Sequence, residues 1–387
     1  LVDGKPFLIL VAQVHNASNW PAMLPQVWPA VDALQANTVL MPMAWEQIEP
    51  AEGSFDFSFL DTLVEQARSH KLRLVLLWFA TWKNNGPNYA PHWVKLDNAR
   101  FPRVIARNGK TLNSLSPHAQ ATLDADRKAF VALMQHLKRI DGDQHTVIMV
   151  QVENEAGSYG TDRDHSPAAD RLFAGPVPDA LLRRLGKRPG NWRQVFGKDA
   201  DEFFHAWSVA RYIDQVAAAG KATYALPMYV NAALRDPFHP GPPGAYESGG
   251  PTDNVLDVWK AAAPAIDLLA PDLYVRDYLR YTTVLDRYHR PDNALYVAET
   301  GNDKAYARYV YAALGRQAIG YAPFGMDYTG YSNWPLGTDR SGPEALEPFA
   351  ANYRLLAPMA GLIAARSFEG KLWGAAEPEQ THTQELD

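Results

Sequence analysis

The stretch VIMVQVENEAGSYG, residues 147–160, carries the pattern that decides the fold. Its first six residues are apolar apart from Gln151, and such a run is typical of a strand buried on both faces of a sheet. The run then ends in Glu153, Asn154 and Glu155, followed by a turn that contains two glycines. A buried strand that finishes in carboxyl groups predicts a parallel sheet with a polar site at its carboxyl edge.

Seven other short apolar segments lie along the chain, separated by stretches with helical spacing. Eight strands that alternate with helices predict an α/β fold of the closed (β/α)8 barrel type, also called a TIM barrel. An open doubly wound sheet stays an alternative, although no G-x-G-x-x-G or G-x-x-x-x-G-K-[ST] loop follows a strand. The predicted strands are Phe7–Val14, Thr38–Met43, Arg73–Phe79, Val147–Val152, Leu226–Val230, Ile266–Ala270, Leu295–Ala298 and Ala318–Ala322.

The domain organisation follows from this alternation of predicted strands and helices. We predict that residues 1–365 form the (β/α)8 barrel with long loops, and that residues 366–387 form a polar C-terminal extension or the start of a further domain. Long connections at 84–120, 160–200 and 236–253 each follow a predicted strand. Loops in these positions build the sites of barrel enzymes, so we expect them to shape the site here.

The composition of the chain argues against two kinds of binding partner, nucleic acid and membrane. The net charge of -6 and the lack of Lys/Arg clusters argue against nucleic acid. No apolar run approaches about 18 residues, so we expect no membrane span. The oligomeric state stays open. The chain begins at Leu1 without a leader segment, so its location also stays open, with a secreted or periplasmic protein favoured if a signal peptide was removed before Leu1.

The sequence shows no motif that would bind a metal or a cofactor. It has no cysteine, which excludes a thiolate metal site, and no pair of histidines has H-x-x-x-H spacing. We therefore predict neither a metal nor a cofactor. A G-x-S-x-G nucleophile motif is also missing, which argues against a serine hydrolase.

Two glutamates stand at the ends of predicted strands. Glu155 follows the fourth strand, and Glu299 ends the seventh in the segment YVAETGN. Strands four and seven of an eight-stranded barrel direct their ends into the same bowl, although each glutamate alone also suits a helix cap or an ion pair. Two facing carboxyl groups are what glycosidic cleavage requires, because one protonates the departing oxygen while the other faces the developing positive charge. We therefore take Glu155 and Glu299 as the candidate catalytic pair.

Three motifs resemble a known family. The segment QVENEAGSYG (151–160) resembles the acid/base motif of glycoside hydrolase family 35, and DGKPFLILVAQVH (3–15) and MAWEQIEPAEGSFDFSFLD (43–61) are similar to this family and its family 42 relatives. The resemblance runs from about residue 3 to about residue 330. It implies a retaining, exo-acting β-galactosidase that cleaves terminal β-galactosides by double displacement, with Glu155 as acid/base and Glu299 as nucleophile.

The resemblance also implies further roles. Asn154 takes the position that binds the sugar 2-hydroxyl, and Tyr274 resembles the tyrosine that orients the nucleophile. Glu153 is then a buried, hydrogen-bonded neighbour of the acid/base. His15 ends the first strand, and we expect it to donate or accept hydrogen bonds in the cleft. Aromatic residues near the predicted rims, for which core packing and sugar stacking are both open, add candidate sugar contacts at Trp45, Trp82 and Tyr328.

Three positions depart from the family 35 pattern. Asn16 stands where that family tends to have tyrosine, Thr81 replaces a glutamate, and the asparagine-bearing TNFG of the family becomes APFG from Ala322 onward. These positions help to hold galactose in the family, so the sugar and its linkage stay open. An endo-β-glycanase, another β-glycosidase of the same clan and a catalytically silent carbohydrate-binding barrel are the alternatives.

Overall fold

A closed parallel barrel forms the centre of the molecule in the computed structural model, which describes residues 1–379. The order around the ring is β1-β2-β3-β6-β7-β8-β9-β10, and β10 pairs with β1 to close it. The strands are β1 (Ile9–Gln13), β2 (Thr38–Ala44), β3 (Arg73–Lys83), β6 (Val147–Asn154), β7 (Met228–Ala233), β8 (Leu268–Leu273), β9 (Val297–Thr300) and β10 (Gly320–Pro323). All eight sequence-predicted strands are confirmed, and so is the (β/α)8 fold.

Apolar side chains fill both faces of this sheet. Along β1, Ile9 and Val11 belong to a cluster inside the barrel, whereas Leu10 and Ala12 belong to the layer beneath the helices. The interior cluster also contains Phe79 from β3. Burial on both faces explains why the strands are continuous apolar runs instead of alternating ones.

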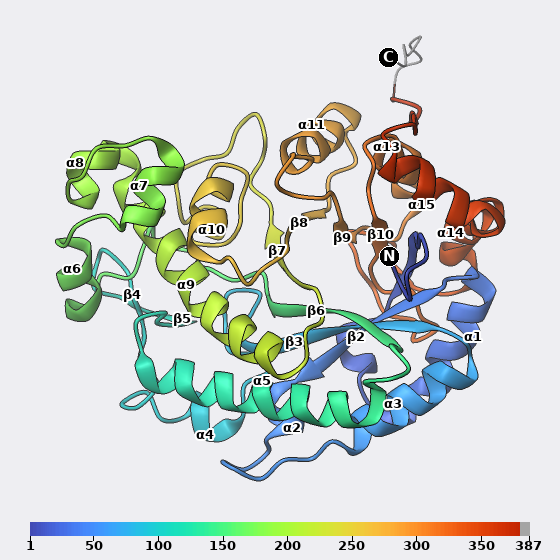
Figure 1. Ribbon diagram of the computed structural model, residues 1–387, viewed down its shortest axis with the longest axis horizontal. Helices are drawn as coiled ribbons and strands as arrows, with labels where there is room; N and C mark the ends of the chain where they lie inside the picture. Colours follow the sequence, from blue (N-terminus) through green and yellow to red (C-terminus); the bar gives the residue numbers. More distant parts are fainter. Residues whose placement is uncertain (380–387) are drawn as a thin grey trace.

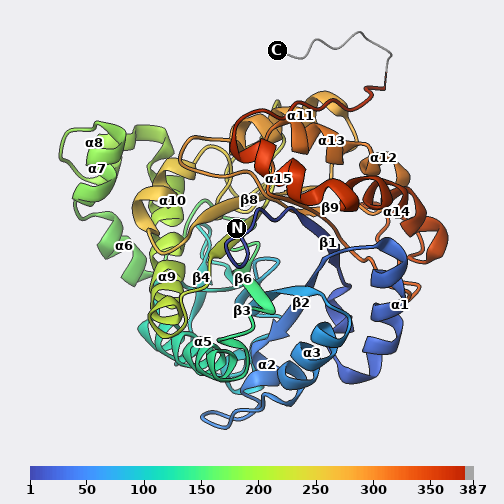
Figure 2. The same ribbon diagram turned by 45° about the vertical axis from the view of Figure 1, so that its right-hand side comes forward.

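Helices surround the barrel, as Figure 2 shows. The amphipathic helix α3 buries Phe59, Leu60, Leu63, Val64 and Ala67 against it. None of the helices in residues 1–379 is both long and apolar enough to cross a bilayer. The α-helices are α1 (Leu24–Leu34), α2 (Trp45–Ile48), α3 (Ser58–Ser69), α4 (His92–Lys95), α5 (Gln120–Asp141), α6 (Pro167–Phe173), α7 (Asp179–Leu185), α8 (Trp192–Phe196), α9 (Ala200–Thr223), α10 (Leu256–Ala262), α11 (Tyr278–Tyr288), α12 (Lys304–Ala307), α13 (Tyr309–Gly315), α14 (Pro343–Leu356) and α15 (Ala360–Phe368).

The long connections contain structure of their own. The connection between β3 and α5 includes an antiparallel hairpin of β4 (Arg103–Ile105) and β5 (Thr111–Leu115), which the sequence reading did not predict. The connection after β6 forms α6, α7 and α8, which gather beside α9 at one side of the barrel (Figure 1). At the other end of the chain, α15 runs on to Phe368, three residues past the predicted domain boundary. The division at residue 365 itself stays a prediction, and part of the predicted extension, residues 380–387, lies outside the described residues.

Candidate active site

A cavity of about 480 Å³ opens at the carboxyl ends of the barrel strands. This is within the usual size of a pocket for a small ligand. Most of its wall comes from residues at or just beyond strand ends, which is the face where barrel enzymes carry their sites. Its polar lining includes Asn16, Lys83, Asn84, Glu155, Tyr159, Arg235, Glu247, Asp272, Tyr274, Arg280, Glu299, Tyr331 and Asn333.

Glu155 enters this cavity from an unusual backbone. Both Glu153 and Glu155 have positive φ angles, 63° and 45°, in the left-handed region that side-chain-bearing residues rarely adopt. The backbone N–H of Glu155 donates to Asn231 Oδ1 of β7 at 3.0 Å, and Asn84 Nδ2 donates to the carboxylate. Strain of this kind persists only where neighbours hold it and is frequent at active sites.

Glu299 lies on β9 and receives hydrogen bonds on both carboxylate oxygens. Gln13 Nε2 and Asn154 Nδ2 donate to Oε1 at 3.0 and 3.3 Å, and the Tyr274 hydroxyl donates to Oε2 at 2.7 Å. Donors that converge on a carboxylate fix its direction. The Glu299 side chain is therefore held in one orientation.

The two glutamates meet a third carboxyl group, that of Asp272 on β8. One oxygen of each of Glu155, Asp272 and Glu299 lies within 4.8 Å of the others. All three side chains are buried, and Asn231 Nδ2 donates to Asp272 Oδ2 at 2.8 Å. Burial, followed by the charges of Glu299 and Glu155, raises the pKa of Asp272 well above its ordinary value. Three carboxyl groups this close do not all ionise together at neutral pH.

Glu155 is a carboxyl group that keeps a proton close to neutral pH. Burial raises its pKa from 4.5 to about 7, the nearby Lys83 cation opposes that shift, and the charge of Glu299 adds to it. A protonated Glu155 beside an anionic Glu299 is the pair of states that general-acid and nucleophilic chemistry needs. The geometry therefore suits acid-assisted cleavage of a glycosidic bond.

Glu153 occupies a different environment from Glu155. It is fully buried, its Oε2 accepts from the backbone N–H of Trp82 at 2.7 Å, and it is not part of the cavity wall. Burial and the neighbouring Asp126 raise its pKa well above the ordinary value. Glu153 is thus buried and hydrogen-bonded, as expected for a residue outside the cavity.

Three of the predicted binding residues contact either Glu299 or a residue of the cavity wall. Tyr274 lines the cavity and contacts Glu299. Asn154 is buried between Glu299 and Lys83, whose Nζ donates to Asn154 Oδ1 at 2.8 Å. The ring of His15 stacks on Tyr331, with 3.7 Å between ring centroids, and so supports a residue of the cavity wall.

The other three predicted sugar contacts lie outside the wall of this cavity. Trp45 is fully buried, and its indole N–H donates to Glu49 Oε2 at 2.9 Å. Trp82 is buried on β3, with its ring edge-on to Tyr212. Tyr328 borders a separate hollow near α14. Aromatic residues close to strand ends pack equally well against helices, and these three do so or face another surface.

Several residues of the cavity are not among the site residues predicted from the sequence. Lys83 was missed because β3 continues four residues beyond the predicted end at Phe79. Asp272 sits two residues before Tyr274, and its place at a strand end was a usable signal. Glu247 and Tyr159 come from loops, where no periodicity indicates the direction of a side chain.

The three departures from the family 35 pattern have different surroundings. Asn16 lines the cavity. Thr81 points away from it, because its hydroxyl donates to Asp126 Oδ2 at 2.7 Å, so this position supplies no carboxylate to the site. Ala322 is part of the barrel interior.

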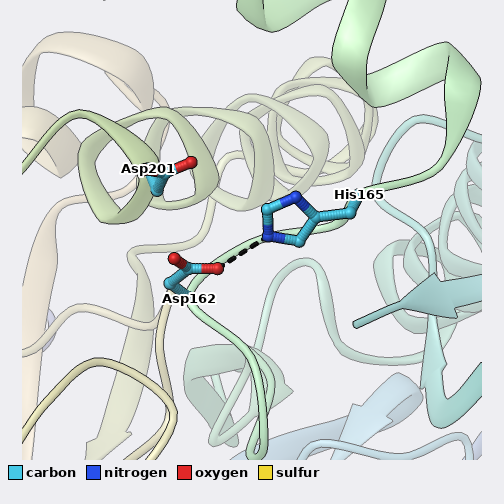
Figure 3. A group of neighbouring side chains, drawn as sticks. All are labelled: Asp162, His165 and Asp201. Carbon is cyan, nitrogen blue, oxygen red and sulfur yellow. Dashed lines mark hydrogen bonds and ion pairs between the residues drawn. The ribbon is translucent and has the colours of Figure 1, made fainter. Parts of the chain in front are cut away.

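Two groups of side chains in residues 1–379 have the spacing of metal ligands. One is the trio of Glu155, Asp272 and Glu299, and the other is Asp162, His165 and Asp201, shown in Figure 3. In the second group His165 contacts Asp162 at 2.7 Å, while the aspartates also pair with nearby arginines. Because those arginines already balance the aspartates, this group is best explained as an ion-pair network that ties the loop after β6 to α9. The arginines are Arg107, Arg163 and Arg193.

The sequence matches to known proteins agree on one class of enzyme. A family model described as Beta-galactosidase, that of glycoside hydrolase family 42, matches residues 29–221. A β-galactosidase of Xanthomonas manihotis is 29% identical over 223 residues, which are 51% of this chain and 35% of that protein. Beta-galactosidase 8 of Oryza sativa subsp. japonica is 26% identical over 168 residues, 42% of this chain and 23% of that protein. The chain is similar in sequence to β-galactosidases, which are glycoside hydrolases.

The family 42 match can be compared with the family expected from the sequence. The match is to family 42, which belongs to the clan expected from the sequence, and the more specific assignment to family 35 is not confirmed. The matched regions span about a third or less of the length of these curated relatives.

Solved structures share the fold at low sequence identity. A β-galactosidase from Bacillus circulans sp. alkalophilus has a TM-score of 0.66 at 14% identity, covering 93% of this chain and 57% of that one. The catalytic domain of a β-amylase from Paenibacillus polymyxa has a TM-score of 0.62 at 12% identity, covering 88% and 96%. Enzymes with different named substrates thus share this barrel, so the substrate must be argued from the site.

Proposed function

We propose that this chain carries the catalytic barrel of a retaining, exo-acting β-galactosidase that removes terminal β-galactosyl groups from oligo- or polysaccharides. The observation that carries the proposal is the meeting of Glu155 and Glu299 in one cavity, with carboxylate oxygens within 4.8 Å. The sequence similarity to β-galactosidases supports the choice of sugar.

The first step of the reaction breaks the glycosidic bond. Glu299, held by its three donors, attacks the anomeric carbon and forms a glycosyl ester, while Glu155 transfers its proton to the departing oxygen. Its pKa of about 7 keeps that proton available at neutral pH. The leaving group departs as a neutral alcohol or sugar.

The second step releases the galactose. Formation of the ester removes the charge of Glu299, so the pKa of Glu155 falls and its carboxylate becomes the base that deprotonates a water molecule. The water oxygen attacks the anomeric carbon from the face opposite to Glu299 as its proton passes to Glu155, and the bond to Glu299 breaks to release it as a carboxylate. Two displacements return the anomeric carbon to its original configuration.

The carboxylate spacing favours retention over inversion. Retaining enzymes hold their two carboxyl groups about 5–5.5 Å apart, whereas inverting enzymes leave about 6.5–9.5 Å to fit a water molecule. Oxygens within 4.8 Å support the shorter arrangement. Tyr274, by holding Glu299 Oε2, supports an oriented nucleophile.

Exo action is supported by the loop after β10. Phe324, Tyr331, Asn333 and Leu336 line the cavity together with Asn16, which follows β1. These residues stand on the side of Glu299 that lies away from Glu155 around the barrel, where the terminal sugar would sit. A wall in this position favours a chain end over the middle of a polysaccharide.

A panel of aryl β-glycosides tests the proposal. We expect hydrolysis of 4-nitrophenyl β-galactoside in preference to the glucoside, mannoside and xyloside, and proton NMR should show the β-anomer of galactose before mutarotation. Preference for internal bonds of a polysaccharide would support the endo-β-glycanase alternative. Folded protein that binds sugars but cleaves none of them would support the silent barrel.

A further inference from the structure

Glu247 is a buried carboxyl group that the catalytic steps do not use. It lies on the loop between β7 and α10, is 1% exposed and lines the cavity. Within residues 1–379 its Oε2 has no hydrogen-bond partner. Burial and the charge of Glu155 raise the pKa of Glu247, and Lys83 and Asn85 oppose the rise. A buried polar atom without a partner is unfavourable, so this oxygen is suited to a hydroxyl group of a ligand.

The backbone fixes Glu247 beside the acid/base. Ser158, three residues after Glu155, exchanges two backbone hydrogen bonds with Ser248, at 2.8 and 3.1 Å. The two loops approach so closely that a Cβ on Gly157 would lie 2.7 Å from the Ser248 carbonyl oxygen. Glu247 is therefore tied to the loop that follows β6.

Glu299 is on the other side of the acid/base. Its strand, β9, lies three positions around the barrel from β6, with β7 and β8 between them. Glu155 protonates the oxygen that joins the two sugars, so the terminal sugar extends from it toward Glu299. The leaving group extends to the opposite side, toward the end of β3. The loop of Glu247 follows β7, but its carboxyl group lies near Lys83 and the side chain of Asn85 at the end of β3, and so reaches that side.

An exposed aromatic ring lies in the same region. Tyr159 lines the cavity, is 42% exposed and belongs to the loop that pairs with the Glu247 loop. Aromatic faces pack well against the C–H faces of pyranose rings, and an acceptor beside them fixes the orientation of the sugar. Tyr159 and Glu247 together supply both contacts.

We propose that Glu247 and Tyr159 form a subsite for the leaving-group sugar, in which Glu247 hydrogen-bonds a sugar hydroxyl and Tyr159 packs against the ring. This assignment rests on the proposed β-galactosidase function and deepens it, because it specifies a sugar as the preferred leaving group. An aryl leaving group has no hydroxyl to offer to Glu247.

The test compares two substrates with the same galactosyl group. Using the best of the β-1,3-, β-1,4- and β-1,6-linked galactosyl-glucose disaccharides, kcat/KM is measured and divided by kcat/KM for 4-nitrophenyl β-galactoside. We expect this ratio to fall at least about tenfold in both Glu247→Ala and Tyr159→Ala, because each loses a contact made only to the sugar. Glu247→Gln, which keeps an acceptor oxygen, should show a smaller fall.

Asp236→Asn is the matched control. Asp236 is on the same loop and borders the same cavity, but Oδ1 already accepts from the backbone N–H groups of Phe238 and His239, and Oδ2 from Arg280. Its ratio should stay within about twofold of the wild type. A ratio that also stays within twofold in Glu247→Ala, Glu247→Gln and Tyr159→Ala would overturn the subsite. Wild-type protein without activity on any galactoside would overturn the proposed function, and the subsite with it.

Discussion

The Glu155→Gln variant should become more stable relative to the wild type as the pH rises. In the unfolded chain the Glu155 carboxyl titrates near 4.5, whereas in the folded protein burial and Glu299 hold its pKa at about 7. Below pH 4.5 both states keep the proton. Between these values the unfolded chain loses its proton while the folded protein keeps it, so the wild type loses stability as the pH rises and reaches a plateau above pH 7.

The size of the effect follows from the two pKa values. A pKa difference between folded and unfolded states costs about 1.36 kcal/mol per unit once the pH exceeds both values. Between pH 5 and pH 8 the Glu155 contribution amounts to about 2–3 kcal/mol of lost stability. Glutamine has nearly the same shape but no titration, so the free energy of unfolding of the variant relative to the wild type should increase by this amount.

Urea unfolding at pH 5 and pH 8 measures the difference. Glu65→Gln is the control, because Glu65 is exposed on α3 and should give the same stability difference at both pH values. A Glu155→Gln difference that did not change between pH 5 and pH 8 would refute the raised pKa. It would also remove the physical basis for Glu155 as the proton donor.

Three other predictions concern the chemistry. The Glu299→Ala variant should lose turnover, and added azide should restore it with an α-galactosyl azide as the product. The Glu155→Ala variant should still carry out the first step on dinitrophenyl β-galactoside, and with azide it should give a β-galactosyl azide. Product NMR that showed the reverse anomers would exchange the two roles. Tyr274→Phe removes a donor to Glu299 Oε2, so kcat should fall about 10- to 100-fold with little change in KM, and steady-state kinetics that showed only a KM effect would contradict this role. Dialysis against EDTA should leave activity unchanged, because the proposed steps use carboxyl groups alone. A loss of activity that a divalent ion reversed would point to the group of Glu155, Asp272 and Glu299 as a metal site.

The fold was predictable because the barrel strands are buried on both sides. Segments such as Val147–Val152 are continuously apolar, and their alternation with helical periods leaves few architectures. Glu155 and Glu299 were predictable for the same reason, since a carboxyl group at the end of an apolar strand has few places to point. The hairpin of β4 and β5 was not, because its sequence has mixed polarity and is exposed in part.

The remaining parts of the site depend on tertiary contacts. Trp45 and Trp82 are of a residue type that often contacts sugars. The direction of a side chain at a strand end, however, depends on local twist and on neighbours such as Glu49 and Tyr212. Glu247 is brought to the cavity by a pairing between residues 158 and 248, ninety positions apart in sequence. Local patterns carry no information about such a pairing.

That pairing has a consequence for how this barrel can change. In many barrels a loop after one strand can be lengthened or exchanged without regard to the next, and new specificities arise in this way. Here the segment after β6 and the segment after β7 are joined by backbone hydrogen bonds, and Gly250 lies so close to Ala156 that any Cβ would meet its carbonyl oxygen at 2.4 Å. Grafting either segment alone into a related scaffold should misplace Glu155, so recombination of this protein has to carry both segments as one exchangeable unit.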